Sequence, residues 1–212
     1  MNPNNTARVG VTRELLIALR LSLLLFLLCG LIYPAITTFI AHRLFPAQAG
    51  GSLIYENGKA VGSVLIGQPF VSARYFQGRP SAAGYDPRAT AGSNLAPSNP
   101  ALRLRVAVDS ARIQKRDGVS ATAIPVDLLA ASGSGLDPDI SPAAALLQVP
   151  RVAQARGLSV ASVRALVQAH TEGPQWKLWG QSRVNVLVLN LALDQLQRSV
   201  SAKGTSSHAR QP

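Results

Sequence analysis

The strongest feature of the hydrophobic pattern is one uninterrupted apolar block near the N-terminus. Residues 21–40 read LSLLLFLLCGLIYPAITTFI and carry no charged side chain. A helix rises about 1.5 Å per residue, so this block matches a hydrocarbon core of roughly 30 Å. The pattern predicts a transmembrane helix over 21–41, in which Pro34 introduces a kink and Gly30 provides a small-residue spot for packing against other helices.

Charges that flank the block predict its orientation. Segment 1–20 carries Arg8, Arg13 and Arg20 against Glu14, and positive charge near a short N-terminus favours the cytoplasm. The long C-terminal part then lies outside, which is the periplasm in a Gram-negative bacterium. We therefore expect a single-pass protein of a bacterial inner membrane, in contact with membrane lipid and with a cytoplasmic N-terminus.

A cleaved secretory signal is the alternative interpretation of the same block. Residues 47–49, Ala-Gln-Ala, satisfy the small-x-small rule for a cleavage site, and the mature chain would then begin at Gly50. The apolar part of a signal usually runs only about 7 to 15 residues, and this block is longer. The length favours an anchor that stays in the membrane.

Alternating apolar and polar residues predict a β-hairpin at the start of a domain that we expect over 50–198. Segments 52–56 and 59–66 are strand-like runs on either side of an Asn-Gly pair, the two-residue turn that fits the twist of paired strands. A long loop over 68–100, rich in Gly, Pro, Ser and Asn, follows. Loops of this length are functional surfaces or disordered segments. The candidate partner contacts in this loop are Gly92, Ser93, Asn94 and Asn99.

Helical periodicity and capping residues predict three helices in the middle of the chain. The first occupies 100–118, with its arginines and lysine on a solvent-exposed face. The second begins after Ser141, and Pro150 kinks or splits it. The third begins after Ser159 and ends at His170, where a cationic side chain suits the helix terminus.

The C-terminal part completes the predicted fold class. The β-branched run 183–189 predicts a strand, and Asn190 is expected to cap a last helix. Residues 199–212 predict a disordered tail. Strands at both ends with helices between them predict an α+β or α/β domain with a small sheet, whose strand order the sequence leaves open.

The charge balance changes the expected partners only slightly. There are 21 basic and 10 acidic residues, a formal net charge of +11, which raises the question of nucleic acid binding. The basic residues are scattered singly and aromatic residues make up only 5% of the chain, so phosphate-tracking runs and stacking surfaces are lacking. We expect no nucleic acid partner, and an attraction to anionic lipid or to an acidic partner subunit instead.

Few side chains suit a metal or redox centre. The one cysteine, Cys29, lies inside the apolar block, so no disulfide framework can form. The histidines His42, His170 and His208 have no ligand spacing. We expect no metal and no intrinsic cofactor.

A segment rich in glycine and hydroxyl groups, 132–141, is the candidate site for an anion. It reads SGSGLDPDIS and precedes a helix N-terminus, whose free N–H groups attract phosphate. It lacks the spacing of a Walker loop or of GxGxxG, and its polar residues also suit turns and caps. The candidate contacts for an anion, a nucleotide or a partner are Ser132, Gly133, Ser134, Gly135, Asp137 and Ser141.

The same segment raises a serine hydrolase as a further interpretation. Ser132 or Ser134 would act with His170 and a carboxylate from Asp137 or Asp139. No GxSxG elbow surrounds either serine, and these residue types occur together by chance in most chains. We expect no catalytic residues.

Two tryptophans form a separate candidate contact. Trp176 and Trp179 lie with Lys177 in a loop between Gly173 and Gly180. Tryptophan suits a membrane interface or a protein partner, because its ring is apolar and its N–H is polar. An ordinary place in the core or at its rim is the alternative.

Five segments of the chain carry a likeness to a known family. They are GSLIYENGKAVGSVLIGQPF, YFQGRPSA, YDPRATAGSNLAPSNPAL, DLLAASGSGLDPDISPAAALLQVPRVAQARGL and RVNVLVLNLALD. Together they resemble the C subunit of the Kdp potassium-transporting ATPase, the KdpC family. The likeness runs from the membrane helix to about Asp194, and the SGSGLDP-ISP and GSNL-PSNP patterns are specific to that family. Asp86 and Asp139 depart from it, since asparagine and histidine are common at these positions.

The resemblance implies a non-catalytic accessory subunit of an ATP-driven potassium importer. Its partners would be an ATPase subunit, a channel-like potassium-binding subunit and a small peptide subunit. The family is described as a catalytic chaperone that raises the ATP affinity of the ATPase subunit, so ATP enters through the complex. A domain outside the membrane does not meet cytoplasmic nucleotide, which favours a stabilising clamp; a nucleotide-binding regulator is the alternative.

Overall fold

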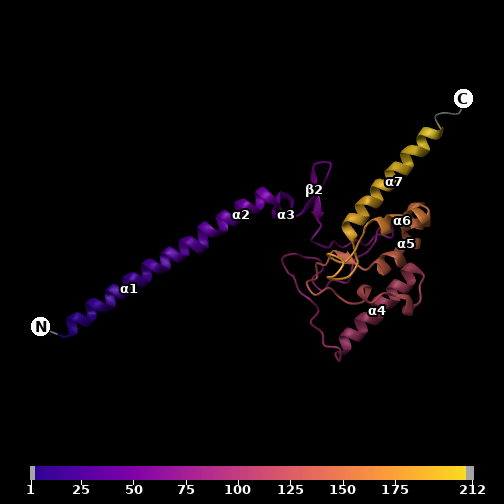
Figure 1. The fold of residues 1–212 in the computed structure, drawn as a ribbon. Helices are drawn as coiled ribbons and strands as arrows, with labels where there is room; N and C mark the ends of the chain where they lie inside the picture. The colour runs from indigo at the N-terminus through magenta and orange to yellow at the C-terminus, as the bar shows by residue number, and fades with distance from the viewer. Residues whose placement is uncertain (1–2, 209–212) are drawn as a thin grey trace. The chain divides into compact units, whose positions relative to one another are not determined.

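The computed structural model describes residues 3–208, and its side chains over 11–202. Residues 1–2 of the predicted cytoplasmic segment and 209–212 of the predicted tail lie outside the described residues. The chain divides into two compact units, Met1–Leu53 and Ile54–Pro212. The first is a long helix and the second is a mixed domain (Figure 1).

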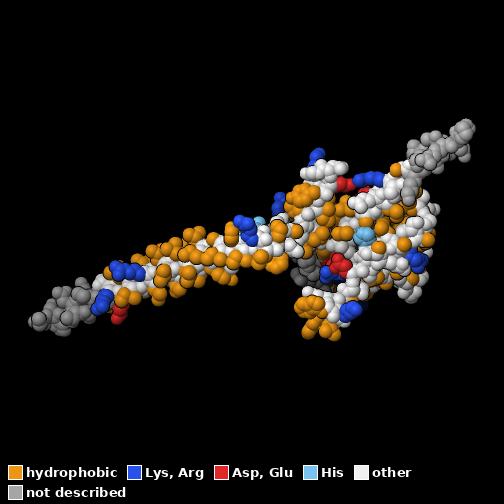
Figure 2. All heavy atoms as spheres, turned by 45° about the horizontal axis from the view of Figure 1, so that its top comes forward, with side chains coloured by type: hydrophobic (Ala, Val, Ile, Leu, Met, Phe, Trp, Pro, Cys, Tyr) orange, Lys and Arg blue, Asp and Glu red, His pale blue; other side chains and the backbone are white. Residues whose placement is uncertain are grey.

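The first unit is one helical rod built from the apolar block. It comprises α1 (Pro3–Leu27), the π-helical segment η1 (Leu28–Ile32), α2 (Tyr33–Leu44) and the short α3 (Pro46–Ala49). The stretch Val11–Leu44 is long and apolar enough to cross a membrane, and none of its most apolar window is buried. Figure 2 shows this surface as almost wholly hydrophobic between charged ends. The structure thus confirms a long apolar N-terminal helix.

The helix changes its winding just before Pro34. Proline has no N–H to donate to the preceding turn, and π-helical winding is one way in which a helix accommodates such an interruption. The N–H of Tyr33 bonds the carbonyl of Leu28, and Thr37 Oγ1 donates to the carbonyls of Tyr33 and Pro34 at 2.9 and 3.1 Å. The π-helical segment is therefore the local adjustment around Pro34.

The predicted hairpin opens the second unit. Strands β1 (Leu53–Glu56) and β2 (Lys59–Ser63) form a two-stranded sheet. Asn57 and Gly58 have φ of 50° and 77°, and a turn with two positive φ values matches the twist of a hairpin. The second strand is shorter than its predicted range, because it ends at Ser63.

Four α-helices, α4 to α7, lie in the domain (Figure 1). Helix α4 (Pro100–Asp117) starts at its cap Asn99 and ends at Gly118, and α5 (Pro142–Arg156) starts at its cap Ser141 and ends at Gly157. Pro150 lies inside α5 and does not split it. Helix α6 (Val160–Ala169) is capped by Ser159, and α7 runs over Val186–His208. Two short 3₁₀ helices, η2 (Ala121–Ala123) and η3 (Val126–Leu128), follow α4.

The small sheet of the domain contains only the first part of the strand predicted over 183–189. Strands β3 (Asp139–Ile140), β5 (Arg183–Asn185) and β4 (Thr171–Glu172) pair antiparallel in that order. The predicted strand 183–189 is wrong beyond Asn185, because the chain turns there into α7. The run 186–189 places Val186, Leu187 and Leu189 in the core as helical residues, and a short apolar run suits a buried helix as well as a strand.

Asn190 is likewise no helix cap. It lies within α7, buried, and its side chain bonds both the N–H and the carbonyl of Phe76 at 2.9 Å. The predicted disordered tail, 199–212, overlaps the last turns of α7, which the structure continues to His208.

The core lies among α5, α6, α7 and β5. Val149 and Val152 from α5 pack with Val163 and Val167 from α6. Phe76, from the long loop, is fully buried in the same cluster. The loop 64–99 contains no helix or strand among the described residues, yet it is part of the core through Phe76.

Candidate functional site

The hydroxyl groups of the predicted anion segment, 132–141, accept hydrogen bonds from nearby backbone N–H groups. Ser132 is 3% exposed, and its Oγ accepts from the N–H groups of Gly135 and Asp137 at 2.9 and 3.3 Å. Ser134 Oγ accepts from Leu136 N, and Ser141 Oγ accepts from Ala144 N. These bonds fold the segment into turns and cap α5. An anion contact at these residues stays a prediction.

The structure separates the residues of the hydrolase interpretation. His170 Nδ1 bonds the carbonyl of Leu166 at 2.9 Å, at the end of α6. Ser132 Oγ instead meets backbone N–H groups and Ser134 Oγ. No hydrogen bond found among residues 11–202 joins either serine to His170 or to a carboxylate, so the described geometry gives no support to nucleophilic catalysis here.

Two of the predicted contact segments lie against each other. A Cβ added at Gly92 would stand 2.8 Å from the carbonyl oxygen of Gly133, so the two glycines allow a close backbone approach. Gly135 has φ of 75°, and a Cβ added there would stand 2.9 Å from the carbonyl oxygen of Ala91. Of the other partner-loop residues, Asn99 caps α4 through its bond with Ala101 N, while Ser93 and Asn94 lie near Gly92 in sequence.

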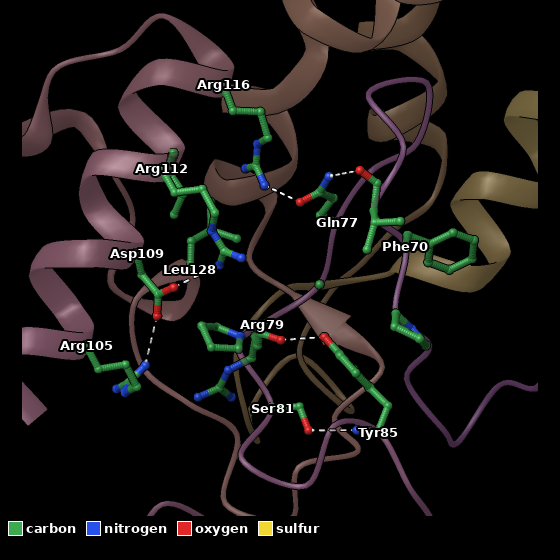
Figure 3. Close-up of a pocket in the computed structure, with 15 residues that line it drawn as sticks. Phe70, Gln77, Arg79, Ser81, Tyr85, Arg105, Asp109, Arg112, Arg116 and Leu128 are labelled. Carbon is green, nitrogen blue, oxygen red and sulfur yellow. Dashed lines mark hydrogen bonds and ion pairs between the residues drawn. The ribbon is translucent and has the colours of Figure 1, made fainter. Parts of the chain in front are cut away.

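A pocket between α4 and the long loop, which was not predicted from the sequence, is lined by several charged side chains (Figure 3). It encloses about 340 Å³. Helix α4 contributes one wall, and segment 69–81 with Tyr85 contributes the other. Its charged lining consists of Arg79, Arg105, Asp109, Arg112 and Arg116.

The positive charge of this arginine pocket exceeds the negative charge that faces it. Arg105 and Arg112 share one carboxylate, that of Asp109, at 3.2 and 2.8 Å. Arg116 is paired with Asp117, which also holds Arg151 on its other oxygen. Each of these sets, two arginines around one aspartate, therefore keeps one positive charge. The remaining arginine of the pocket, Arg79, is neutralised by Asp137.

That fourth arginine connects the pocket to the predicted segment. Arg79 donates to Asp137 at 2.7 Å, and Ser81 Oγ donates to the carbonyl of Gly135 at 2.7 Å. The Tyr85 hydroxyl donates to the carbonyl of Arg79. Burial, with the nearby Asp137 carboxylate, raises the pKa of Tyr85, so its hydroxyl stays neutral and remains a donor.

Within residues 11–202, two guanidinium nitrogens of the pocket are buried without a hydrogen-bond partner. They are Nε of Arg79 and Nε of Arg105. Arginine presents its donors in a planar fork that matches carboxylate and phosphate oxygens. The arrangement is therefore chemically suited to a small oxyanion.

The pocket was not predicted because the charges of α4 do not all lie on one face. The arginines and lysine were expected on a solvent-exposed face, and Arg103, Arg112 and Lys115 are exposed, whereas Arg105 and Arg116 are partly buried. The aspartates between them are the residues that the prediction left out: Asp117 has a fully buried side chain and Asp109 a largely buried one. Charged residues in a helical pattern normally indicate a solvated face. The available signal was the presence of two carboxylates, Asp109 and Asp117, on a helix with five basic residues.

A second set of polar side chains holds the long loop in place. We call Gln148, Arg151, Arg156 and Asn190 the loop-anchoring residues. The amide of Gln148 bonds Gln77 N and O at 2.9 and 3.1 Å. The guanidinium of Arg151 donates to the carbonyls of Ala73 and Tyr75. Burial lowers the pKa of Arg151, and its bond with Asp117 opposes that shift.

The remaining loop-anchoring residues act on the same stretch of backbone. Arg156 donates through Nε to the carbonyl of Arg74 at 2.6 Å and through Nη1 to Asp194 at 2.7 Å. Its guanidinium also lies 4.6 Å from the centre of the Tyr75 ring. Together with the two Asn190 bonds, these contacts satisfy the backbone of 73–77 as a neighbouring strand would.

The two tryptophans lie on the surface, which rules out the alternative of a place in the core. They belong to the loop 173–182, which joins the paired strands β4 and β5. Trp176 and Trp179 are 79% and 66% exposed, and Leu178 between them is 81% exposed. The loop is an apolar projection on a hairpin.

The elements described so far define a class of protein. A helix long and apolar enough to span a bilayer precedes a mixed domain with two small antiparallel sheets. Comparison with known proteins narrows the class. The family model described as K+-transporting ATPase, c chain (KdpC) matches residues 15–195.

Individual relatives agree with the family model. A potassium-transporting ATPase KdpC subunit from Shewanella putrefaciens is 58% identical over 195 residues, which are 92% of this chain and 98% of the relative. The subunit from Xanthomonas oryzae pv. oryzae is 55% identical over 174 residues, 82% of this chain and 83% of the relative. The one from Sorangium cellulosum is 54% identical over 180 residues, 84% and 95%.

The chain belongs to the KdpC family and is a subunit of a Kdp potassium-transporting ATPase complex. This confirms the resemblance carried by the sequence segments. The match covers both the apolar helix and the domain, from residue 15 to residue 195.

Proposed function

We propose that this chain is a non-catalytic accessory subunit that stabilises the assembled potassium importer and acts as a catalytic chaperone or clamp for its larger subunits. The observation that carries the proposal is the match to a potassium-transporting ATPase subunit over 98% of that relative's length. The partners would be the ATPase subunit, the channel-like subunit and the small peptide subunit.

The apolar helix supports this role. Its side chains face outward around the whole circumference, and its winding changes at the π-helical segment ahead of Pro34. In a bilayer such irregular helices are stabilised by packing against neighbouring helices. We propose that Gly30 and Pro34 lie on the face that contacts a partner helix.

We further propose that the domain lies on the outer side of the inner membrane. The support is the excess of arginine in the short N-terminal segment. The test uses Val126→Cys, an exposed position in η3, in a chain whose own cysteine is replaced by Cys29→Ser. An impermeant thiol reagent should label intact cells carrying the variant. Labelling that requires broken cells would place the domain in the cytoplasm.

Reconstitution tests the accessory role itself. The complex lacking this chain should lose most of its potassium-stimulated ATP hydrolysis and regain it when the purified chain is added. The chain alone should hydrolyse no ATP. Full hydrolysis by the partner subunits without it, at the same ATP concentrations, would contradict the proposal.

A second candidate function is favoured by the arginine pocket. Arg105 and Arg112 keep one positive charge beside Asp109, and a second is shared by Arg116 with Arg151, which does not line the pocket. This charge and the unpaired guanidinium nitrogens of Arg79 and Arg105 suit the phosphate groups of a nucleotide. In this alternative the chain is a regulator that raises the ATP affinity of the ATPase subunit by direct contact. It requires the domain on the cytoplasmic side, so the labelling experiment separates the two functions.

Photolabelling tests the alternative directly. An ATP analogue should label the full chain, and the double variant Arg105→Gln with Arg112→Gln should lose the label. A matched control is Arg103→Gln with Arg164→Gln, which removes the same charge from exposed positions of α4 and α6. Equal loss in both double variants would indicate a general charge effect and would sink the pocket as a nucleotide site.

A further inference from the structure

The loop 173–182 presents three large apolar side chains to solvent from a fixed base. The base is the antiparallel pair β4 and β5, where Thr171 faces Val184 and Glu172 faces Arg183. The Glu172 and Arg183 side chains also form an ion pair at 3.0 Å. The loop is therefore anchored at both of its ends.

The tip of the loop is held by its own backbone hydrogen bonds. Gln175 and Trp179 exchange two N–H to carbonyl bonds, at 2.8 and 3.0 Å, and Lys177 N donates to the carbonyl of Pro174 at 2.9 Å. A closed tip of this kind presents its side chains in one arrangement before any ligand arrives, which reduces the entropy lost on binding.

The backbone at the tip adopts a conformation that bulky residues avoid. Trp176 and Lys177 have φ of 52° and 62°, in the left-handed region. For a bulky side chain this region is a genuine outlier, and such outliers cluster at sites of function. The side chains thus displayed, Trp176, Leu178 and Trp179, are among the most exposed apolar residues of the domain.

We propose that this loop inserts into the interfacial region of the lipid bilayer as a second membrane contact of the chain. Tryptophan concentrates at the level of lipid headgroups, where its ring is in an apolar medium and its N–H finds a partner. Leu178 would reach toward the acyl chains. The proposal rests on the membrane anchoring of the proposed function.

Lys177 distinguishes lipid from a protein pocket. It lies at the same tip, exposed, between Trp176 and Leu178. Inside a dry protein interface its ammonium group would need a buried carboxylate, and lysine is depleted in the cores of such interfaces. Among lipid headgroups it meets phosphates, and its long stem lets the charge stay at the surface.

The covalent connection to the anchor makes the contact geometrically accessible. Eight residues, 45–52, separate the end of α2 at Leu44 from the start of β1 at Leu53. A tether of eight residues spans at most about 29 Å. The domain is therefore kept at high local concentration beside the bilayer, where even a weak surface contact is populated.

The chain carries its own reporter for the test. Trp176 and Trp179 are the only two tryptophans of the 212 residues, so the tryptophan emission comes entirely from this loop. The full chain is reconstituted into vesicles of phosphatidylethanolamine and phosphatidylglycerol, with or without bromine on the acyl chains. Brominated lipid should quench at least half of the emission. Lys177→Glu should weaken the quenching, and Lys59→Glu, the same charge change on the exposed face of β2, should not.

Flotation of the vesicles separates the possible failures. A chain that floats with the vesicles but keeps its full emission in brominated lipid overturns the loop proposal and leaves the anchor intact. A chain that does not float refutes the anchoring itself. A shift in the emission of this chain that occurs only when the partner subunits are added, after their own emission has been subtracted, and without quenching by brominated lipid, would assign the loop to a protein partner and would also overturn the proposal.

Discussion

Two groups of arginines in the same domain differ in what surrounds them. Arg151 and Arg156 have almost fully buried side chains and bond the carbonyls of 73–75 as well as the carboxylates of Asp117 and Asp194. Arg105 and Arg112 share a single carboxylate, that of Asp109, and line the pocket; Arg105 has one further acceptor, the carbonyl of Leu129, and Arg112 has none besides Asp109 among the described residues. The first group is committed to holding the loop, and the second retains charge for an external partner.

The role of an arginine in this domain follows from the number of acceptors around it. Arg151 and Arg156 each have at least three acceptors, although Nη2 of Arg156 is buried without one. A buried charge persists where it is paired and most of its donors are satisfied. An arginine with few protein acceptors is tolerated in a folded domain only where water or a ligand can accept its remaining hydrogen bonds.

Removing a buried arginine should damage the fold. Arg151→Met leaves Asp117 fully buried with only Arg116 and frees the carbonyls of Ala73 and Tyr75. Breaking a buried pair costs about 3–5 kcal/mol, so chemical denaturation of the solubilised chain should show a loss of that order. Arg103→Met, on the exposed face of α4, should stay within about 0.5 kcal/mol of the parent. Equal losses of unfolding free energy in Arg151→Met and Arg103→Met would contradict a structural role for Arg151.

Removing a neutral loop-anchoring residue should cost less. Asn190→Ala leaves the N–H and carbonyl of Phe76 buried without their side-chain partner. Buried unsatisfied groups cost about 1–3 kcal/mol. Hydrogen exchange should become faster at Phe76 and its neighbours than in the core of α5. Unchanged protection at Phe76 would mean that the loop does not depend on this residue.

A pocket arginine should behave in the opposite way. Arg112 is largely exposed and shares Asp109 with Arg105, so Arg112→Gln should change the unfolding free energy by about 0–1 kcal/mol. Binding of an anionic ligand to the pocket should weaken markedly, as measured by titration calorimetry at constant ionic strength. A large loss of stability with unchanged anion binding would place Arg112 in the structural group.

The smallest expected effect concerns a carboxylate of the sheet. Burial raises the pKa of Asp139 above its ordinary value, although Arg183 opposes the shift. The folded state therefore prefers the protonated form, and the ionised group lowers stability once the pH rises through that raised pKa. Asp139→Asn should raise the unfolding midpoint slightly at neutral pH and not at all below the ordinary pKa. A gain that persists in acid would refute this cause.

Local signals predicted much of the fold. The Asn-Gly turn of the hairpin, the caps Ser141 and Ser159, the stops Gly118 and Gly157 and the apolar helix all follow from residue types at fixed offsets. The strand 183–189 failed because Val and Leu runs fit a buried helix equally well, and only packing against α5 and α6 decides.

The candidate site was less predictable, because its charges belong together only in three dimensions. Arg79 and Arg112 are 33 residues apart in the sequence, and no local spacing joins them. The role of Asn190 was hidden for the same reason, since its partner Phe76 lies 114 residues away. The segment 132–141 was visible as a motif, but its hydroxyls are used in turns and a helix cap, and the carboxylates of Asp137 and Asp139 pair with Arg79 and Arg183.

The account depends most on the chain acting inside a larger assembly, and co-purification tests this directly. A tag placed after residue 212 should recover the ATPase, channel-like and small peptide subunits from gently solubilised membranes, in a fixed ratio that persists through size-exclusion chromatography. Recovery of the chain alone, folded and embedded in detergent, would contradict the account.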